Sequence, residues 1–104
     1  SKEIEAYLVD DYFGLLDELK NTGKAYFVPK YNDGGIEYIF FKMEKGVAVL
    51  PGLDFMFMSF AQEFLSDENI EKYTDNAKYL YAFCEVNGFG AKNIKLDTNK
   101  SFHL

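Results

Sequence analysis

The chain has 104 residues, of which 48% are hydrophobic and 18% aromatic, and its formal net charge is −6 at pH 7. This composition excludes an intrinsically disordered segment, and the length predicts a single domain over residues 1–104. Cys84 is the only cysteine, which excludes an internal disulfide and a thiolate zinc site. Because a lone reduced thiol is typical of cytosolic proteins, we expect a cytoplasmic location. No apolar run approaches the roughly 20 residues of a membrane span, so we expect no membrane partner.

Residues 3–20 have the periodicity of an amphipathic helix. Apolar side chains recur at intervals of three and four, at Ile4, Leu8, Tyr12, Leu15 and Leu19. Gly23 follows as a stop signal, because glycine readily adopts the left-handed conformation that ends many helices. The pattern predicts an amino-terminal helix with one buried face.

The periodicity then changes to that of strands. Short apolar and aromatic runs occupy residues 25–30, 36–43 and 47–50, and turn-forming residues such as Pro51-Gly52 separate or end them. Short connections of this kind predict an antiparallel meander of three strands.

The next segment, residues 53–65, is compatible with a buried strand or a buried helix. Ser59 and Gln62 have the spacing of a capping box. In this motif the serine hydroxyl accepts from the backbone amide of the glutamine, and the glutamine side chain accepts from the backbone amide of the serine. We therefore expect a strand that ends near Met58 and a helix from Phe60 to Leu65. A second short helix is expected over residues 67–77.

Residues 78–86 carry two competing patterns. As a strand, they place Tyr79, Tyr81 and Phe83 on one face. As a helix that continues from Ile70, they gather Leu80 and the neighbouring residues 83–84 in one stripe. The aromatic content favours the strand. Residues 93–96 then read as a partner strand, and the tail from Asp97 as the start of a last helix. The expected fold is α+β, with a small antiparallel sheet of three to five strands packed against the amino-terminal helix and one or two further short helices.

Gly88-Phe89-Gly90 raises the question of a phosphate-binding loop. A dinucleotide fingerprint needs a third glycine where Asn93 stands, and the Gly-Lys-Ser/Thr of a P-loop is absent. We expect a tight turn between two strands, where glycine supplies positive φ at little steric cost.

Residues with catalytic potential are few. His103 is the only histidine and lies next to the end of the chain, and Cys84 has no base beside it in the sequence to activate its thiol. We therefore expect no catalytic residue, no cofactor site and no metal site. The remaining candidates are aromatic: Tyr79, Tyr81 and Phe83, on an exposed sheet face, are the expected contact with a partner.

The order of elements resembles the amino-terminal domain of the enhanced serine sensitivity (SseB-type) bacterial proteins. The matching residues are Val28-Pro29, Phe57-Met58-Ser59, Asn87 to Gly90 and Ile94 to Asp97. Gly88 stands where that family usually has proline, and Met58 where it usually has threonine. The resemblance covers nearly the whole chain and implies a fold without an established catalytic activity.

The second half of the chain also resembles the core-binding domain of tyrosine recombinases and phage integrases. Residues 69–89 are similar to the long helix of that family, in which tyrosine, leucine and phenylalanine recur before a glycine. In that family the helix lies against DNA, so this resemblance implies a DNA-binding fragment.

We expect a non-enzymatic protein-interaction or regulatory module of a bacterial or phage protein. Its expected partner is another protein, with a homodimer as one candidate, and the net charge of −6 argues against nucleic acid because each phosphate contact needs a lysine or arginine. The alternative is the DNA-binding fragment of an integrase.

Overall fold

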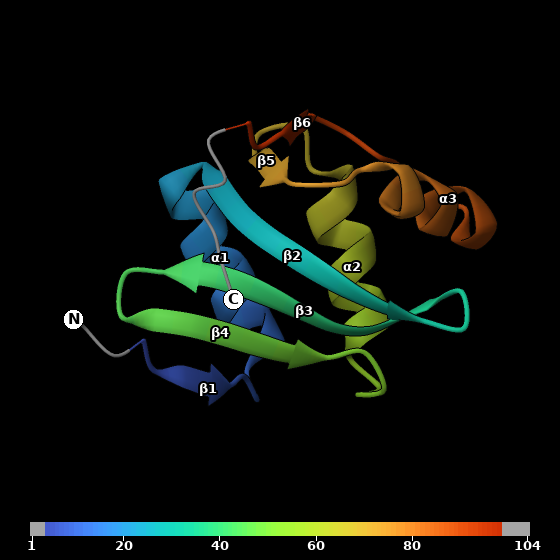
Figure 1. Ribbon diagram of the computed structural model, residues 1–104. Coiled ribbons are helices and arrows are strands. Elements are labelled where there is room, and N and C mark those ends of the chain that lie inside the picture. Colours follow the sequence, from blue (N-terminus) through green and yellow to red (C-terminus); the bar gives the residue numbers. More distant parts are fainter. Residues whose placement is uncertain (1–3, 99–104) are drawn as a thin grey trace.

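The computed structural model describes residues 4–98, which form six strands and three helices around one sheet (Figure 1). In chain order these elements are β1 Ala6–Leu8, α1 Tyr12–Thr22, β2 Lys24–Asn32, β3 Gly35–Met43, β4 Gly46–Pro51, α2 Phe57–Ser66, β5 Glu71–Thr74, α3 Lys78–Asn87 and β6 Ile94–Leu96.

The strands lie in the order β1-β4-β3-β2-β5-β6. β2, β3 and β4 form the expected antiparallel meander, whereas β1 with β4, β2 with β5 and β5 with β6 pair in parallel. Five strands therefore run in one direction and only β3 runs against them. The α+β class is confirmed, and the sheet is larger than the meander that the sequence predicts.

The three helices share one hydrophobic core with one face of the sheet. In Figure 1, α1 and α2 lie behind the sheet. The ring of Phe64 in α2 lies 5.2 Å from those of Phe27 and Phe41, measured between ring centroids, and Leu80 of α3 belongs to the same buried cluster. None of the described helices is long and apolar enough to cross a membrane.

The expected helix over residues 3–20 is wrong in its first half, because residues 6–8 form the edge strand β1. The amide of Val9 donates to the carbonyl of Val49 at 3.0 Å, which extends the pairing with β4. α1 begins only after Asp11, whose Oδ1 accepts from the amide of Gly14 at 2.9 Å. Gly23 ends α1 with a φ of 73°, as predicted.

α2 begins three residues before the predicted Phe60, and Ser59 lies inside it rather than at its cap. The N-cap residue is Met56, which makes no side-chain capping bond, and Asp54 organises the turn before the helix. Its Oδ1 accepts from the amide of Met56 at 2.8 Å, and its carbonyl accepts from the amide of Phe57 at 3.0 Å. The predicted strand up to Met58 is wrong, because α2 already begins at Phe57 and the residues between Pro51 and Phe57 form turns.

The assignments of residues 67–77 and 78–86 are exchanged relative to the prediction. β5 occupies Glu71–Thr74, inside the expected helix, and α3 occupies the expected strand. In α3 the buried residues are Leu80, Phe83 and Cys84, which is the helical stripe and not the strand pattern. Burial of these residues in the common core decides the outcome over the strand propensity of the aromatic residues.

The glycine pair ends a helix and does not join two strands. Gly88 has a φ of 68° at the carboxyl cap of α3, and the amide of Phe89 donates to the carbonyl of Cys84 at 2.8 Å. The predicted strand over residues 93–96 is present as β6 (Ile94–Leu96), but it pairs in parallel with β5 and not with residues 78–86, which are helical. The expected helix from Asp97 onward falls almost wholly outside the described residues.

Candidate functional site

The carboxyl ends of the five co-directional strands meet at one end of the sheet. Ligands of open α/β sheets bind in the crevice at this end. β2 ends there at Asn32, β4 at Pro51 and β5 at Thr74, and α3 begins four residues after β5. We call this region the carboxyl end of the sheet.

A pair of tyrosine rings joins β2 to α3 at the carboxyl end. The rings of Tyr31 and Tyr79 are 5.6 Å apart between centroids and tilted by 50°. Burial raises the pKa of Tyr31, and the nearby Cys84 and Asp75 raise it further. Its hydroxyl and that of Thr74 are buried and have no hydrogen-bond partner among the described residues. The pair thus combines a half-buried ring with one that is 57% exposed.

The loop after β4 exposes large apolar side chains at the same end of the sheet. Leu53 is 97% exposed and Phe55 is 89% exposed. Gly52 fixes the start of this loop, because its amide donates to the carbonyl of Glu37 at 2.7 Å and a Cβ there would collide with the carbonyl of Ile36. The loop is therefore held by backbone contacts while its side chains stay in solvent.

The structure separates the three expected contact residues. Tyr79 and Tyr81 are 57% and 46% exposed, but both lie on the helix α3 and not on a sheet face. Residues two apart on a helix do not share a face. Phe83 is only 7% exposed and its ring packs on that of Phe89 at 5.9 Å. Contact of these residues with a partner stays a prediction. The sequence gives no sign that Tyr31 lies against Tyr79, because the two residues are distant along the chain.

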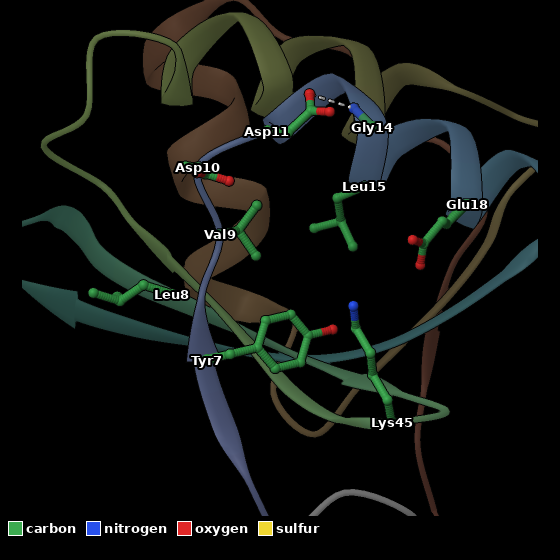
Figure 2. A pocket seen from close by; sticks show the side chains of 9 residues that line it. All are labelled: Tyr7, Leu8, Val9, Asp10, Asp11, Gly14, Leu15, Glu18 and Lys45. Carbon is green, nitrogen blue, oxygen red and sulfur yellow. Dashed lines mark hydrogen bonds between the residues drawn. The ribbon is translucent and has the colours of Figure 1, made fainter.

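A pocket of about 250 Å³ lies elsewhere, between β1, α1 and the turn from β3 to β4 (Figure 2). Its lining residues are Tyr7, Leu8, Val9, Asp10, Asp11, Gly14, Leu15, Glu18 and Lys45.

The charges around this pocket disfavour an anionic ligand. Three carboxylates, those of Asp10, Asp11 and Glu18, oppose the single amine of Lys45, whose Nζ lies 4.8 Å from the centre of the Tyr7 ring. Burial raises the pKa of Tyr7, and the charge of Glu18 raises it further. The volume also lies below the roughly 300–1,000 Å³ of ordinary ligand pockets.

Lys72 of β5 is a buried cation that the sequence does not reveal. Its Nζ donates to three backbone carbonyls, those of Asp67 at 2.5 Å, Ile70 at 3.0 Å and Lys92 at 2.7 Å. Burial lowers the pKa of Lys72 to about 8, and the charges of Asp67 and Cys84 act in the opposite direction. All three amine protons are used in these bonds, so the lysine fastens two loops to β5.

The described residues do not fit a metal centre. Within residues 4–98, no three histidine, cysteine, aspartate or glutamate side chains lie close enough together to hold a metal ion. Asp75 and Asp97 stand after β5 and β6 near the carboxyl end, and the amide of Asp97 donates to the carbonyl of Thr74 at 2.8 Å.

Comparison with solved structures identifies the fold. The chain matches Escherichia coli RNase D with a TM-score of 0.67 and 15% identity, over 91% of this chain and 27% of that one. It matches the EXO domain of Aedes aegypti Nibbler with a TM-score of 0.63 and 13% identity, over 91% and 55%. It matches the EXD2 exonuclease domain with a TM-score of 0.63 and 10% identity, over 88% and 55%. The chain thus spans between about a quarter and a half of these neighbours.

No family model matches the sequence, and no curated protein matches it. The structural matches correct both family resemblances, because the neighbours are exonuclease domains and neither SseB-type nor recombinase domains. The expected non-enzymatic interaction module and the alternative integrase fragment rested on those resemblances and are wrong with them. At 10–15% identity, the likeness establishes that this chain has the fold of exonuclease domains.

Proposed function

We propose that the chain is part of a nucleic-acid-processing enzyme and forms the sheet and first helices of its exonuclease-type domain. The observation that carries this proposal is the match to three exonuclease domains over 88–91% of the chain. RNase D of Escherichia coli is an exoribonuclease involved in structured RNA processing, and the EXD2 structure was soaked with Mg and dGMP. The proposed ligand is accordingly the end of a single nucleic-acid strand.

The carboxyl end of the sheet supplies a surface for such a strand. The exposed ring of Tyr79 can stack on a base, and each base–aromatic stack contributes about 1–3 kcal/mol to binding. Lys78 of α3 is a basic residue near this end, and Lys30 of β2 is another, although its amine already pairs with Glu37 at 3.7 Å. The net charge of −6 opposes phosphate binding, so stacking has to carry more of the affinity than ion pairing, and the dependence on salt should be shallow.

Hydrolysis of the strand is a separate step that these residues do not complete. If the domain uses metal ions, ligands from outside residues 4–98 have to join the carboxylates at this end. The cytoplasmic location, the single domain and a homodimer remain predictions.

Anisotropy of a fluorescent 12-nucleotide single strand, titrated with the complete natural polypeptide at 50 mM salt, tests the proposal. We expect Tyr79→Ala to weaken binding by roughly 5- to 100-fold, because one stack is lost. Tyr81→Ala is the matched control, since it removes a similarly exposed tyrosine from another side of the same helix. Absence of binding to single-stranded RNA and DNA, or equal losses in both variants, would contradict the proposal. Degradation of an end-labelled strand with Mg²⁺ or Mn²⁺ shows whether the enzyme hydrolyses it.

A further inference from the structure

Helix α3 ends in an asparagine–glycine pair. Asn87 is the last residue of the helix, Gly88 is its carboxyl cap, and no other asparagine of the sequence is followed by glycine. The side-chain amide of an asparagine can be attacked by the backbone nitrogen of the next residue, and glycine hinders this attack least because it has no side chain. The pair therefore joins an amide that can be lost to the least hindered nucleophile in the chain.

The last turn of α3 lies in solvent. Residues 85–88 are all exposed, and the side chain of Val86 is 84% exposed. A Cβ built on Gly88 would meet no atom within 4 Å apart from those of its chain neighbours, so a five-membered ring between Asn87 and Gly88 has room. Because few buried contacts hold this turn, it belongs to the segments that open at low cost in free energy.

Two hydrogen bonds oppose the reaction while the turn is closed. The side-chain amide of Asn87 donates to the carbonyl of Phe83 at 2.8 Å, and the backbone amide of Gly88 donates to the carbonyl of Glu85 at 3.3 Å. The second bond is longer than the usual range of about 2.7–3.2 Å. Both bonds lie in the last turn, so fraying of this turn alone releases the leaving amide and the attacking nitrogen together.

We propose that Asn87 is a site of spontaneous deamidation and that the reaction uncaps α3. The backbone nitrogen of Gly88 loses its proton to hydroxide and bonds to Cγ of Asn87. The bond between Cγ and Nδ2 breaks, and Nδ2 leaves as ammonia after taking a proton from water. Water then opens the succinimide ring at either of its two carbonyls, which gives aspartate or isoaspartate at position 87. This proposal does not depend on nucleic-acid binding.

Both products weaken the end of the helix. Aspartate loses the bond to the carbonyl of Phe83 and places a negative charge at the negative end of the helix dipole. Isoaspartate adds a methylene group to the backbone, so the amide of Phe89 no longer meets the carbonyl of Cys84, to which it donates at 2.8 Å. The ring of Phe89, which packs on that of Phe83 at 5.9 Å, is displaced with the cap.

Ageing of the complete natural polypeptide at mildly alkaline pH, followed by tryptic digestion and mass spectrometry, tests the site. Cleavage after lysine puts three asparagines on separate peptides: Asn76 on residues 73–78, Asn87 on residues 79–92 and Asn93 on residues 93–95. We expect the peptide of Asn87 to gain about 1 Da, as two separable isomers, at least about tenfold faster than the other two, whose asparagines precede alanine and isoleucine. Equal rates in the three peptides, or an unchanged Asn87 in the folded protein, would overturn the proposal.

Three variants connect the reaction to the stability of α3. Asn87→Gln keeps an amide but would have to close a larger ring, so ageing should lower the Tm of the native protein and leave that of this variant unchanged. Asn87→Asp reproduces one product and should have a lower Tm than the native protein. Asn76→Asp is the matched control, because its carboxylate still accepts from the amide of Lys78 and lies at the positive end of the same helix. Equal losses on ageing in the native protein and Asn87→Gln, or equal Tm values of the two aspartate variants, would contradict the uncapping.

Discussion

Replacing Lys72 with methionine should destabilise the protein, because the lysine amine ties two loops to β5 through three backbone carbonyls. Its side chain is 0% exposed and donates to the carbonyls of Asp67, Ile70 and Lys92 at 2.5, 3.0 and 2.7 Å. Methionine fills a similar volume, but it leaves three inward-facing carbonyls without this donor.

The magnitude follows from two opposing contributions. Each buried acceptor that loses its donor costs about 1–3 kcal/mol. The native lysine, however, carries a desolvation cost that methionine avoids: its pKa falls from 10.5 to about 8, a difference equivalent to about 3 kcal/mol. We expect a net loss of about 2–4 kcal/mol in the free energy of unfolding, or a fall in Tm of roughly 10–25 °C.

Urea unfolding followed by circular dichroism measures this loss. Lys95→Met is the matched control on the neighbouring strand β6, where the amine is exposed and forms an ion pair with Glu71 at 3.0 Å. The control should change the free energy of unfolding by less than about 1 kcal/mol. If Lys72→Met is as stable as the native protein, the three carbonyl bonds do not hold the loops as we describe.

The pH dependence of the free energy of unfolding provides a second test of the environment of Lys72. The pKa of Lys72 is about 8 in the folded protein against 10.5 as the ordinary value, so between these limits the unfolded chain binds more protons. The free energy of unfolding should therefore rise as the pH increases from 8 toward 10. Lys72→Met should lack this rise, and a native profile as flat as that of the variant would refute the lowered pKa.

Four further substitutions test other parts of the fold. Gly52→Ala should lower the free energy of unfolding by more than about 2 kcal/mol, because its Cβ would collide with the backbone of β3. Gly88→Ala should lower it by only about 1 kcal/mol, because only its positive φ opposes a side chain. Thermal unfolding compares the two variants, and equal losses would contradict the steric argument. Tyr31→Phe should leave the protein unchanged or stabilise it by about 1 kcal/mol in urea unfolding, since its buried hydroxyl lacks a partner in the described part of the chain; a clear loss would reveal a partner. Tyr12→Phe should cost about 1 kcal/mol by removing the 2.9 Å bond to the carbonyl of Pro51. Because the pKa of Tyr12 is raised from 10.0 to about 12, its contribution should be present below pH 10 and disappear as the pH rises through 12, and a pH-independent difference between variant and native protein would disprove this.

The meander and its turns were predictable because their signals are local. β2, β3 and β4 contain strand-forming residues between glycine-rich or proline-containing turns, and a hairpin needs only neighbouring residues to form. Gly23 likewise ends α1 where the sequence predicts, since a left-handed cap depends on one residue.

The second half of the chain was not predictable because its signals conflict. Residues 78–87 fit a strand by propensity and a helix by the spacing of Leu80, Phe83 and Cys84, and burial in the common core selects the helix. β5 was not predictable either, because its lysine is buried only when the preceding loop and the segment around Lys92, 20 residues further along the chain, both supply carbonyls to it. The pairing of Tyr31 with Tyr79 arises in the same way, from elements that meet only in the folded protein.

The sequence by itself determined a compact acidic α+β chain, a three-stranded meander and an apolar core, because composition and local periodicity act over a few residues at a time. Only the tertiary structure decided that β1, β5 and β6 extend the meander in parallel, and hence that the chain has the fold of exonuclease domains. Parallel pairing joins segments that are far apart in the chain, so its energy depends on the whole core and leaves no short pattern in the sequence.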